Sequence, residues 1–290
     1  MLSHILTRTA CAVTLASGTV LAAAPITHAA PDGPHYVALG DSFSAGAGVF
    51  PFSDAAVCGR SAVNYPALLA DRLQVATFTD VSCSGATLDK LTTAQAGIIS
   101  GANRPQLEAL TPDTTLVTMT MGGNDIDLTS TAMRCVNVLP EPLGVSCASE
   151  FTAGGHDVFV ERIAALESTY DRALNEIHSH APQATVVIAG YPTVSRPGAC
   201  WEQPAWSSDA DYLQSILNRL NEMLRTVVTR RGDVFVDTAT STVGHDMCAA
   251  PDQQWVNGLI PSSSAAIAPL HPNARGEQNI ADQMIGALHH

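Results

Sequence analysis

The sequence predicts an α/β fold with three layers, α/β/α, around a five-stranded, mainly parallel sheet. Two observations carry this prediction. Short apolar runs of strand length alternate along the chain with longer amphipathic segments of helix length, as in sheets covered by helices on both faces. Polar motifs also follow three of the apolar runs directly, where parallel strands of one sheet bring their carboxyl ends together.

The expected strands are short and apolar. The first ends at a glycine, the second alternates apolar and polar residues, and the third is β-branched and stops at a glycine pair. The five expected strands are Tyr36–Leu39, Val75–Val81, Thr114–Met121, Thr185–Ala189 and Val234–Asp237.

The expected helices show apolar residues at helical spacing. Between His156 and His180, for example, Ile163, Leu166, Tyr170 and Leu174 form one face. The four expected helices are Asn64–Leu73, His156–His180, Asp209–Arg230 and Asn273–Leu288.

The first residues have the pattern of a secretory signal peptide. Residues 1–30 contain no Asp or Glu and a single Arg, Arg8, and their apolar run from Ala10 to Ala24 is too short to span a bilayer. We expect residues 1–29 to be a signal peptide and residues 30–290 to form a single domain of an exported protein.

Cleavage there would remove Cys11 and leave six of the seven cysteines. An even number of cysteines in an exported chain favours disulfides over a metal site, because the sequence has no C-x-x-C pair. Six cysteines allow fifteen pairings. Sequential pairing is the simplest: Cys58–Cys83, Cys135–Cys147 and Cys200–Cys248.

The charge of the chain excludes several classes of partner. The formal net charge is −13, which disfavours nucleic acid and electrostatic docking onto anionic lipid.

Four motifs contain residues suited to acyl transfer. Ser42, Gly85 and Asn124 each follow a different expected strand, and His271 lies just before the last helix, where Pro272 disfavours helix at the histidine itself. We expect Ser42 to be the nucleophile and His271 its base. The N–H groups of Ser42 and Gly85 and the side-chain amide of Asn124 would form the oxyanion hole.

Each motif alone also has an ordinary structural explanation. Ser42 can cap a helix, Gly85 can occupy a simple turn, and Asn124 can cap a helix that starts at Asp125. A single loop histidine such as His271 is commonly a surface residue.

Taken in order, the motifs resemble those of the SGNH (GDSL-type) hydrolase superfamily. The matching residues are Gly40-Asp41-Ser42, Cys83-Ser84-Gly85-Ala86, Gly122-Gly123-Asn124-Asp125 and His271-Pro272-Asn273. With the stretch Trp255-Val256-Asn257-Gly258 and the six cysteines, the chain is most similar to secreted actinobacterial lipases and esterases of that group.

The resemblance implies a flavodoxin-like fold, hydrolysis of carboxylic esters through a Ser42 acyl-enzyme, and no metal or organic cofactor. We further expect a secreted monomer that acts on small-molecule or lipid esters, binds no nucleic acid and does not insert stably into membranes.

One position departs from the family pattern. The family usually has an aspartate three residues before the histidine, and this chain has Ala268 there. We expect the backbone carbonyl of Ala268 to orient His271 in a Ser–His dyad. The alternative is a carboxylate from the preceding loop, either Asp246 or Asp252.

The substrate is left open by the sequence. The insertions Thr129–Glu150, Pro192–Trp206 and Ser241–Ala268 are expected to wall the pocket. Within them, five side chains can line an acyl groove or pack beneath loops: Trp201, Trp206, Trp255, Leu259 and Ile260.

Four functions compete with a lipase or esterase. They are a phospholipase, a polysaccharide acetylesterase, a metallophosphatase that uses Asp41 and Asn124, and a non-catalytic binding protein. The absence of G-x-S-x-G argues against an α/β-hydrolase.

Overall fold

The computed structural model describes residues 33–260 and 268–289. The expected signal peptide, residues 1–29, lies outside the described residues. No helix among the described residues is long and apolar enough to span a bilayer.

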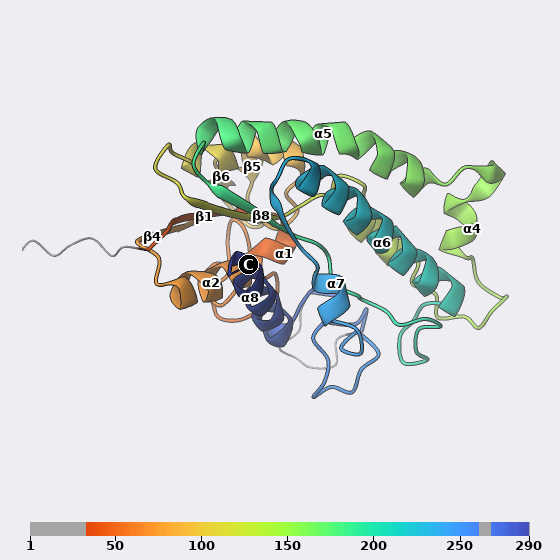
Figure 1. Ribbon diagram of the computed structural model, residues 1–290. Helices are drawn as coiled ribbons and strands as arrows, with labels where there is room; N and C mark the ends of the chain where they lie inside the picture. The colour runs from red at the N-terminus through yellow and green to blue at the C-terminus, as the bar shows by residue number, and fades with distance from the viewer. Residues whose placement is uncertain (1–32, 261–267, 290) are drawn as a thin grey trace, which may run out of the picture. The chain divides into compact units, whose positions relative to one another are not determined.

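A five-stranded sheet with every neighbouring pair parallel forms the centre of the fold. Its strand order is β4-β1-β7-β8-β9 (Figure 1). The strands are β1 (His35–Gly40), β4 (Thr77–Asp80), β7 (Leu116–Thr120), β8 (Thr185–Ala189) and β9 (Val234–Val236). Each of the five overlaps one expected strand.

Helices cover both faces of this sheet, as the three-layer prediction requires. Figure 1 shows α5 and α6 side by side on one face, with α2 and α8 on the other. These long helices are α2 (Tyr65–Leu73), α5 (Val158–His180), α6 (Ser207–Arg230) and α8 (Ala274–Leu288). Asn64, Asp157 and Asn273 cap three of them through their side-chain oxygens, so these helices begin where the sequence places a capping residue.

Strand residues point alternately into two apolar cores. In β1, Val37 and Leu39 join the core beneath α5 and α6, whereas Tyr36 and Ala38 join the core beneath α2 and α8. The strand is therefore buried on both faces, which explains why it is an almost continuous apolar run.

The remaining elements are short and lie in the connections. The helices are α1 (Ser42–Ala45), α3 (Leu128–Arg134), α4 (Cys147–Phe151) and α7 (Thr238–Ser241), with 3₁₀ turns η1 (Leu88–Leu91), η2 (Gln106–Ala109) and η3 (Ala153–Gly155). Two small antiparallel pairs complete the fold: β2 (Phe52–Asp54) with β3 (Arg60–Ser61), and β5 (Gln95–Ala96) with β6 (Ala102–Asn103).

Three disulfides fasten the connections: Cys58–Cys83, Cys135–Cys147 and Cys200–Cys248. These are the pairs given by sequential order. The first lies beside the loop that follows β4, and the other two hold the long connections around α3, α4 and the start of α6.

Candidate active site

Ser42 lies at the junction between β1 and α1. Asp41 caps the short helix by accepting a hydrogen bond from the Phe43 N–H at 2.9 Å, which makes Ser42 the first residue of the turn. Gly40, with φ of +132°, permits this abrupt turn. A Cβ at that position would lie 2.1 Å from the Ser44 hydroxyl and 2.7 Å from the Thr120 carbonyl oxygen.

His271 contacts Ser42 directly. Its Nε2 lies 2.7 Å from the Ser42 Oγ, and its Nδ1 lies 2.8 Å from the carbonyl oxygen of Pro269. Because a carbonyl only accepts hydrogen bonds, the neutral ring must carry its proton on Nδ1. The unprotonated Nε2 is then free to accept the Ser42 hydroxyl proton. Burial lowers the pKa of His271, and the bond to Pro269 partly offsets this shift.

The expected role of the Ala268 carbonyl in orienting His271 is wrong, since that oxygen accepts instead from the Asn257 side chain at 3.1 Å. The reason is the backbone at Leu270, whose φ of +62° is left-handed. This turn brings the carbonyl two residues before the histidine, rather than three, toward the ring. Asn257 also holds the turn through its main chain, accepting from the Leu270 N–H and donating to the His271 carbonyl.

The two alternative carboxylates are engaged elsewhere. Asp246 is buried and accepts from the Arg196 Nε at 3.0 and 3.2 Å, while Asp252 accepts from the Gln253 side chain. Within residues 33–260 and 268–289, no carboxylate is hydrogen-bonded to His271.

The expected oxyanion donors belong to neighbouring strand ends. The Cys83 N–H donates to the Gly40 carbonyl, which joins the loop containing Gly85 to the end of β1. Gly85 has a φ of +80°, and Asn124 donates from Nδ2 to the Ala86 carbonyl at 3.0 Å. An amide has two N–H bonds, so this contact leaves Asn124 one more donor. Among the described residues the N–H groups of Ser42 and Gly85 have no hydrogen-bond acceptor.

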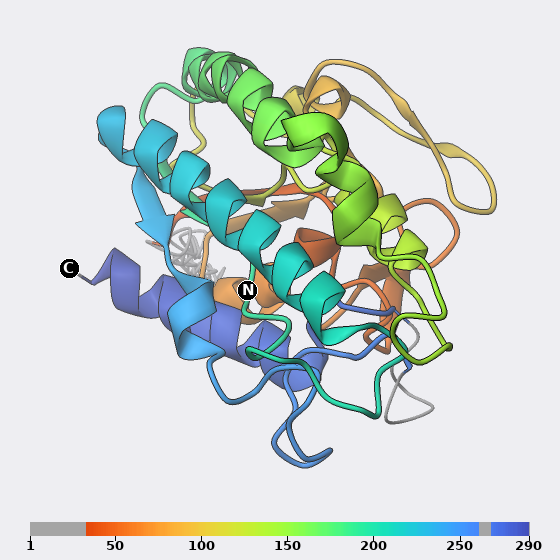
Figure 2. The same cartoon turned by 90° about the vertical axis from the view of Figure 1, so that its right-hand side faces the viewer.

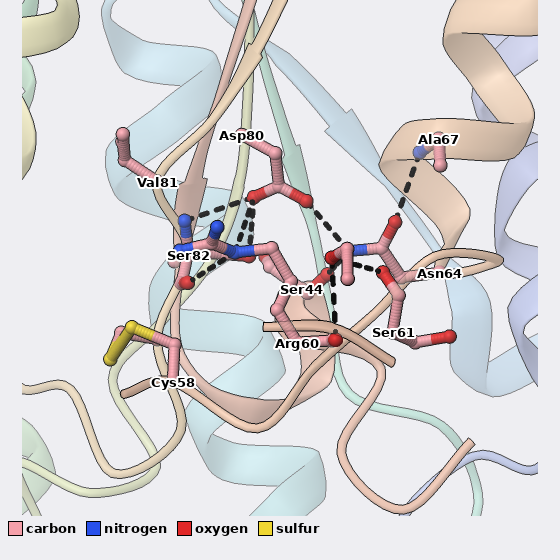
Figure 3. A network of polar contacts seen from close by, with 12 residues as sticks. Ser44, Cys58, Arg60, Ser61, Asn64, Ala67, Asp80, Val81 and Ser82 are labelled. Atoms are coloured by element: carbon pink, nitrogen blue, oxygen red, sulfur yellow. Dashed lines mark hydrogen bonds and ion pairs between the residues drawn. A yellow bond between two sulfur atoms is a disulfide. The ribbon is translucent and has the colours of Figure 1, made fainter. Parts of the chain in front are cut away.

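A buried polar network supports this loop from behind (Figure 3). Asn64 donates to the Ser44 carbonyl at 2.9 Å and to Asp80 at 2.7 Å, and Asp80 accepts from both the N–H and the hydroxyl of Ser82. Arg60 donates to the Ser82 carbonyl. The network therefore connects α1 with the chain that leads into Gly85.

Tyr191 was not predicted as a site residue, yet it connects three of the motifs. Its hydroxyl accepts from the Gly123 N–H and donates to Asp41, both at 2.7 Å. Its ring meets Phe43 edge-on, and Phe43 stacks on His271 with centroids 4.6 Å apart. The available signal was its position just after β8, at the same sheet edge as the other motifs.

Buried carboxyl groups surround this junction. Burial raises the pKa of Asp41 to about 7, against the hydrogen bonds from Phe43 and Tyr191 that favour its charged form. Burial likewise raises the pKa of Asp125 to about 6. Asp41 and Asn124 are committed to these internal contacts, and no group of three or more His, Cys, Asp or Glu side chains in the described part of the chain is arranged to hold a metal ion.

An apolar cavity of about 190 Å³ opens beside His271. All three expected insertions contribute to its wall, with Ala132 and Met133 from the first, Val194 and Ala205 from the second, and Met247 and Leu259 from the third. Helix α6 contributes Leu213 and Leu217 to the lining.

Of the five side chains considered for an acyl groove, only Leu259 lines this cavity. Trp201 and Ile260 are exposed, Trp255 stacks on His245, and Trp206 donates to the Leu139 carbonyl.

Comparison with known proteins identifies the family. The model of the GDSL-like lipase/acylhydrolase family matches residues 38–278. The chain belongs to this family. The matched region includes Ser42, Gly85, Asn124 and His271, and the protein is a lipase or esterase of the GDSL type.

Individual relatives agree in sequence and in fold. The chain is 36% identical to Lipase 2 of Streptomyces coelicolor, over 99% of this chain and 97% of that protein. Two crystal structures, phospholipase A1 from Streptomyces albidoflavus and the extracellular lipase of Streptomyces rimosus, each superpose with a TM-score of 0.71. They are 25% and 26% identical to this GDSL enzyme and cover 88% of it and 99% of their own chains.

Proposed function

We propose that this GDSL enzyme is a secreted, monomeric lipase or esterase that hydrolyses carboxylic esters with an apolar acyl chain through an acyl-enzyme on Ser42. The observation that carries the proposal is the contact between Ser42 Oγ and His271 Nε2 at the mouth of an apolar cavity. Three disulfides and the signal-peptide pattern support export.

In the proposed cycle, His271 takes the Ser42 proton as the oxygen attacks the ester carbonyl. The oxyanion is held by the N–H groups of Ser42 and Gly85 and by the Asn124 amide, and each such donor is typically worth ~2.7–4 kcal/mol. The alcohol leaves with the proton from His271, and a water activated by the same ring then releases the acid.

The acid partner of a triad is replaced here by the Pro269 carbonyl. That oxygen can fix the tautomer of His271, but it carries no charge to stabilise the imidazolium. Since only the neutral ring accepts the serine proton and burial lowers its pKa, activity should persist somewhat below the ordinary histidine pKa of ~6.5 and then fall.

The cavity favours acyl chains longer than acetyl. A wall of Leu, Met, Val and Ala side chains offers an acetyl group no specific contact but gives every further methylene apolar surface to cover. This argues against a polysaccharide acetylesterase. A phospholipase is the second candidate, favoured by the likeness to the phospholipase A1 of Streptomyces albidoflavus.

Two measurements test the proposal. An organophosphonate should label the wild-type enzyme at Ser42, and a Ser42→Ala variant should neither be labelled nor hydrolyse esters. A rate series on p-nitrophenyl esters from acetyl to palmitoyl, with phosphatidylcholine alongside, should peak above acetyl. A lack of labelling in a folded protein would favour a non-catalytic binding protein, and a maximum at acetyl would contradict the role of the cavity.

A further inference from the structure

Six large apolar side chains on two loops outside the cavity are exposed to solvent. One loop precedes α4 and the other precedes α6. We call the set the apolar rim: Val136, Val138, Leu139, Leu143, Val145 and Trp201. Trp201 is 90% exposed and Val145 is 76% exposed. Several large apolar side chains exposed on neighbouring loops are unusual, and clusters of this kind commonly mark an interaction site.

The two loops are fastened to each other and to the body of the protein. The Asn137 N–H donates to the Pro204 carbonyl, and the Trp206 indole donates to the Leu139 carbonyl, both at 2.7 Å. The disulfide Cys135–Cys147 closes the base of the first loop, and Cys200–Cys248 joins the second loop to the segment after α7. These bonds therefore fix the backbone of both loops that carry the rim.

The rim borders the cavity. Met133, at the end of α3, lines the cavity and is also 54% exposed, and Ala205 lines it from the second loop. Figure 2 turns the side bearing both loops toward the viewer, where they lie close to the start of α6. A surface that covers the rim therefore also lies beside these two lining residues of the cavity.

The two loops carry few charges, which indicates the kind of lipid surface that they can bind. Residues 136–146 contain one charged side chain, Glu141, and residues 197–206 contain one, Glu202; neither segment has a Lys or Arg. The two arginines that flank these segments, Arg134 and Arg196, are paired with Glu150 and Asp246, and the whole chain has a net charge of −13, so anionic headgroups find little favourable charge there. Projecting aliphatic side chains and a tryptophan suit a deformable lipid–water interface, where the indole ring is favoured.

We propose that the apolar rim inserts into the surface of uncharged or zwitterionic ester-lipid assemblies and so brings the cavity opening against the acyl chains. The rim deepens the proposed function, because it names aggregated lipid as the substrate form. Docking of this kind is peripheral and requires no membrane span.

Binding is measured first with the Ser42→Ala variant, so that hydrolysis does not consume the vesicles. In this background, Val145→Asp and Trp201→Asp should each weaken co-sedimentation with phosphatidylcholine vesicles by about ten-fold, since burial of one large apolar side chain changes an equilibrium constant by at least that factor. The matched control is Ile99→Asp, because Ile99 is 77% exposed and lies between β5 and β6, which Figure 1 shows well apart from α4. It should bind as its parent does.

A second readout reports insertion itself. Brominated phosphatidylcholine should quench the fluorescence of Trp201, and a Trp201→Phe variant should bind the vesicles while losing most of that quenching. With Ser42 intact, Val145→Asp should hydrolyse monomeric p-nitrophenyl butyrate at the parent rate and lose activity only on vesicles.

Three results would overturn the proposal: equal binding of Val145→Asp and Ile99→Asp, binding that requires phosphatidylglycerol, or a dimer in solution that Val145→Asp converts to a monomer. The last would assign the rim to a second copy of the chain. If the enzyme hydrolyses the monomeric ester but does not bind vesicles, the rim proposal fails and the proposed function stands. If it binds vesicles but hydrolyses no ester, the proposed function fails and the proposed role of the rim in lipid binding stands.

Discussion

The two halves of the site are built by different means. On one side, Ser42, Gly85 and Asn124 follow strands of the central sheet, and the hydrogen bonds made by Tyr191 and Asn64 connect the segments around them. On the other side, the cavity wall consists largely of apolar side chains from long insertions that two disulfides fasten, together with Leu213 and Leu217 of α6. The difference indicates that the sheet edge sets the chemistry while the insertions set the choice of ester, so the two should respond separately to mutation.

The largest expected effect is at the base. His271→Ala should lower kcat by about 10⁴-fold or more on every ester, because the serine then lacks a proton acceptor. Rates on acetyl and decanoyl p-nitrophenyl esters check this. Asp246→Asn and Asp252→Asn are the controls, and a thousand-fold loss in either would show that a carboxylate assists His271 after all.

Asn124→Ala should give the next largest effect. Loss of one oxyanion donor should reduce kcat by about 10²–10³-fold, with KM nearly unchanged and the same factor for short and long acyl chains. A loss confined to long chains would place Asn124 on the substrate-selecting side and break the proposed separation.

Changing the wall should alter only the chain-length profile. Leu213→Trp, from a half-buried position on α6, should fill part of the cavity and lower kcat/KM for decanoyl esters by about ten-fold, while acetyl esters change less than about three-fold. Arg219→Trp, at an exposed position of the same helix, is the matched control. Equal losses on both esters, with an unchanged melting temperature, would contradict this division.

The smallest expected effect concerns stability. The folded-state pKa of Asp41 is raised to about 7, so the folded protein binds a proton that the unfolded chain has already lost above pH ~4. The stabilisation is complete below that pH and disappears as the pH rises through about 7. The wild type should therefore melt a few degrees higher at pH 5 than at pH 8, since a domain of this size gains about 2–4 °C per kcal/mol.

Asp41→Asn should reduce that difference in melting temperature, leaving the part due to Asp80, Asp125 and Glu277, whose pKa values burial also raises. The exposed Asp252→Asn is the control. Superimposable melting profiles for the wild type and Asp41→Asn would show that Asp41 is not protonated in the folded state.

Sequence patterns predicted the sheet and its long helices well because burial on both faces leaves a strong apolar signal. The expected strand Val75–Val81 shortens to Thr77–Asp80, an edge strand whose first three residues are all exposed. The two-residue strands and α4 could not be predicted, since so few residues have no periodicity and a disulfide helps to hold α4. The cavity wall could be located only as a set of insertions.

The sequence predicts the site residues that belong to a motif. It does not predict the contacts that depend on backbone conformation. Leucine rarely adopts a left-handed conformation, so the residue type of Leu270 does not predict the turn. The sequence therefore predicts the Ala268 carbonyl as the acceptor for His271, whereas the structure has the carbonyl of the next residue, Pro269. Tyr191 likewise contributes through a hydroxyl between two motifs, a relation that exists only once the strands are side by side.

The oxygen that orients His271 belongs to the main chain. A triad's aspartate is lost by one codon change, but no substitution at position 269 deletes a peptide carbonyl. Side chains in this turn can therefore change during evolution with little loss of activity, provided that two features persist. These are the left-handed conformation at Leu270 and the hydrogen bonds that Asn257 makes to the turn. The orientation of His271 is therefore sensitive to mutations that change the conformation of this loop, and not to the loss of a single charged side chain.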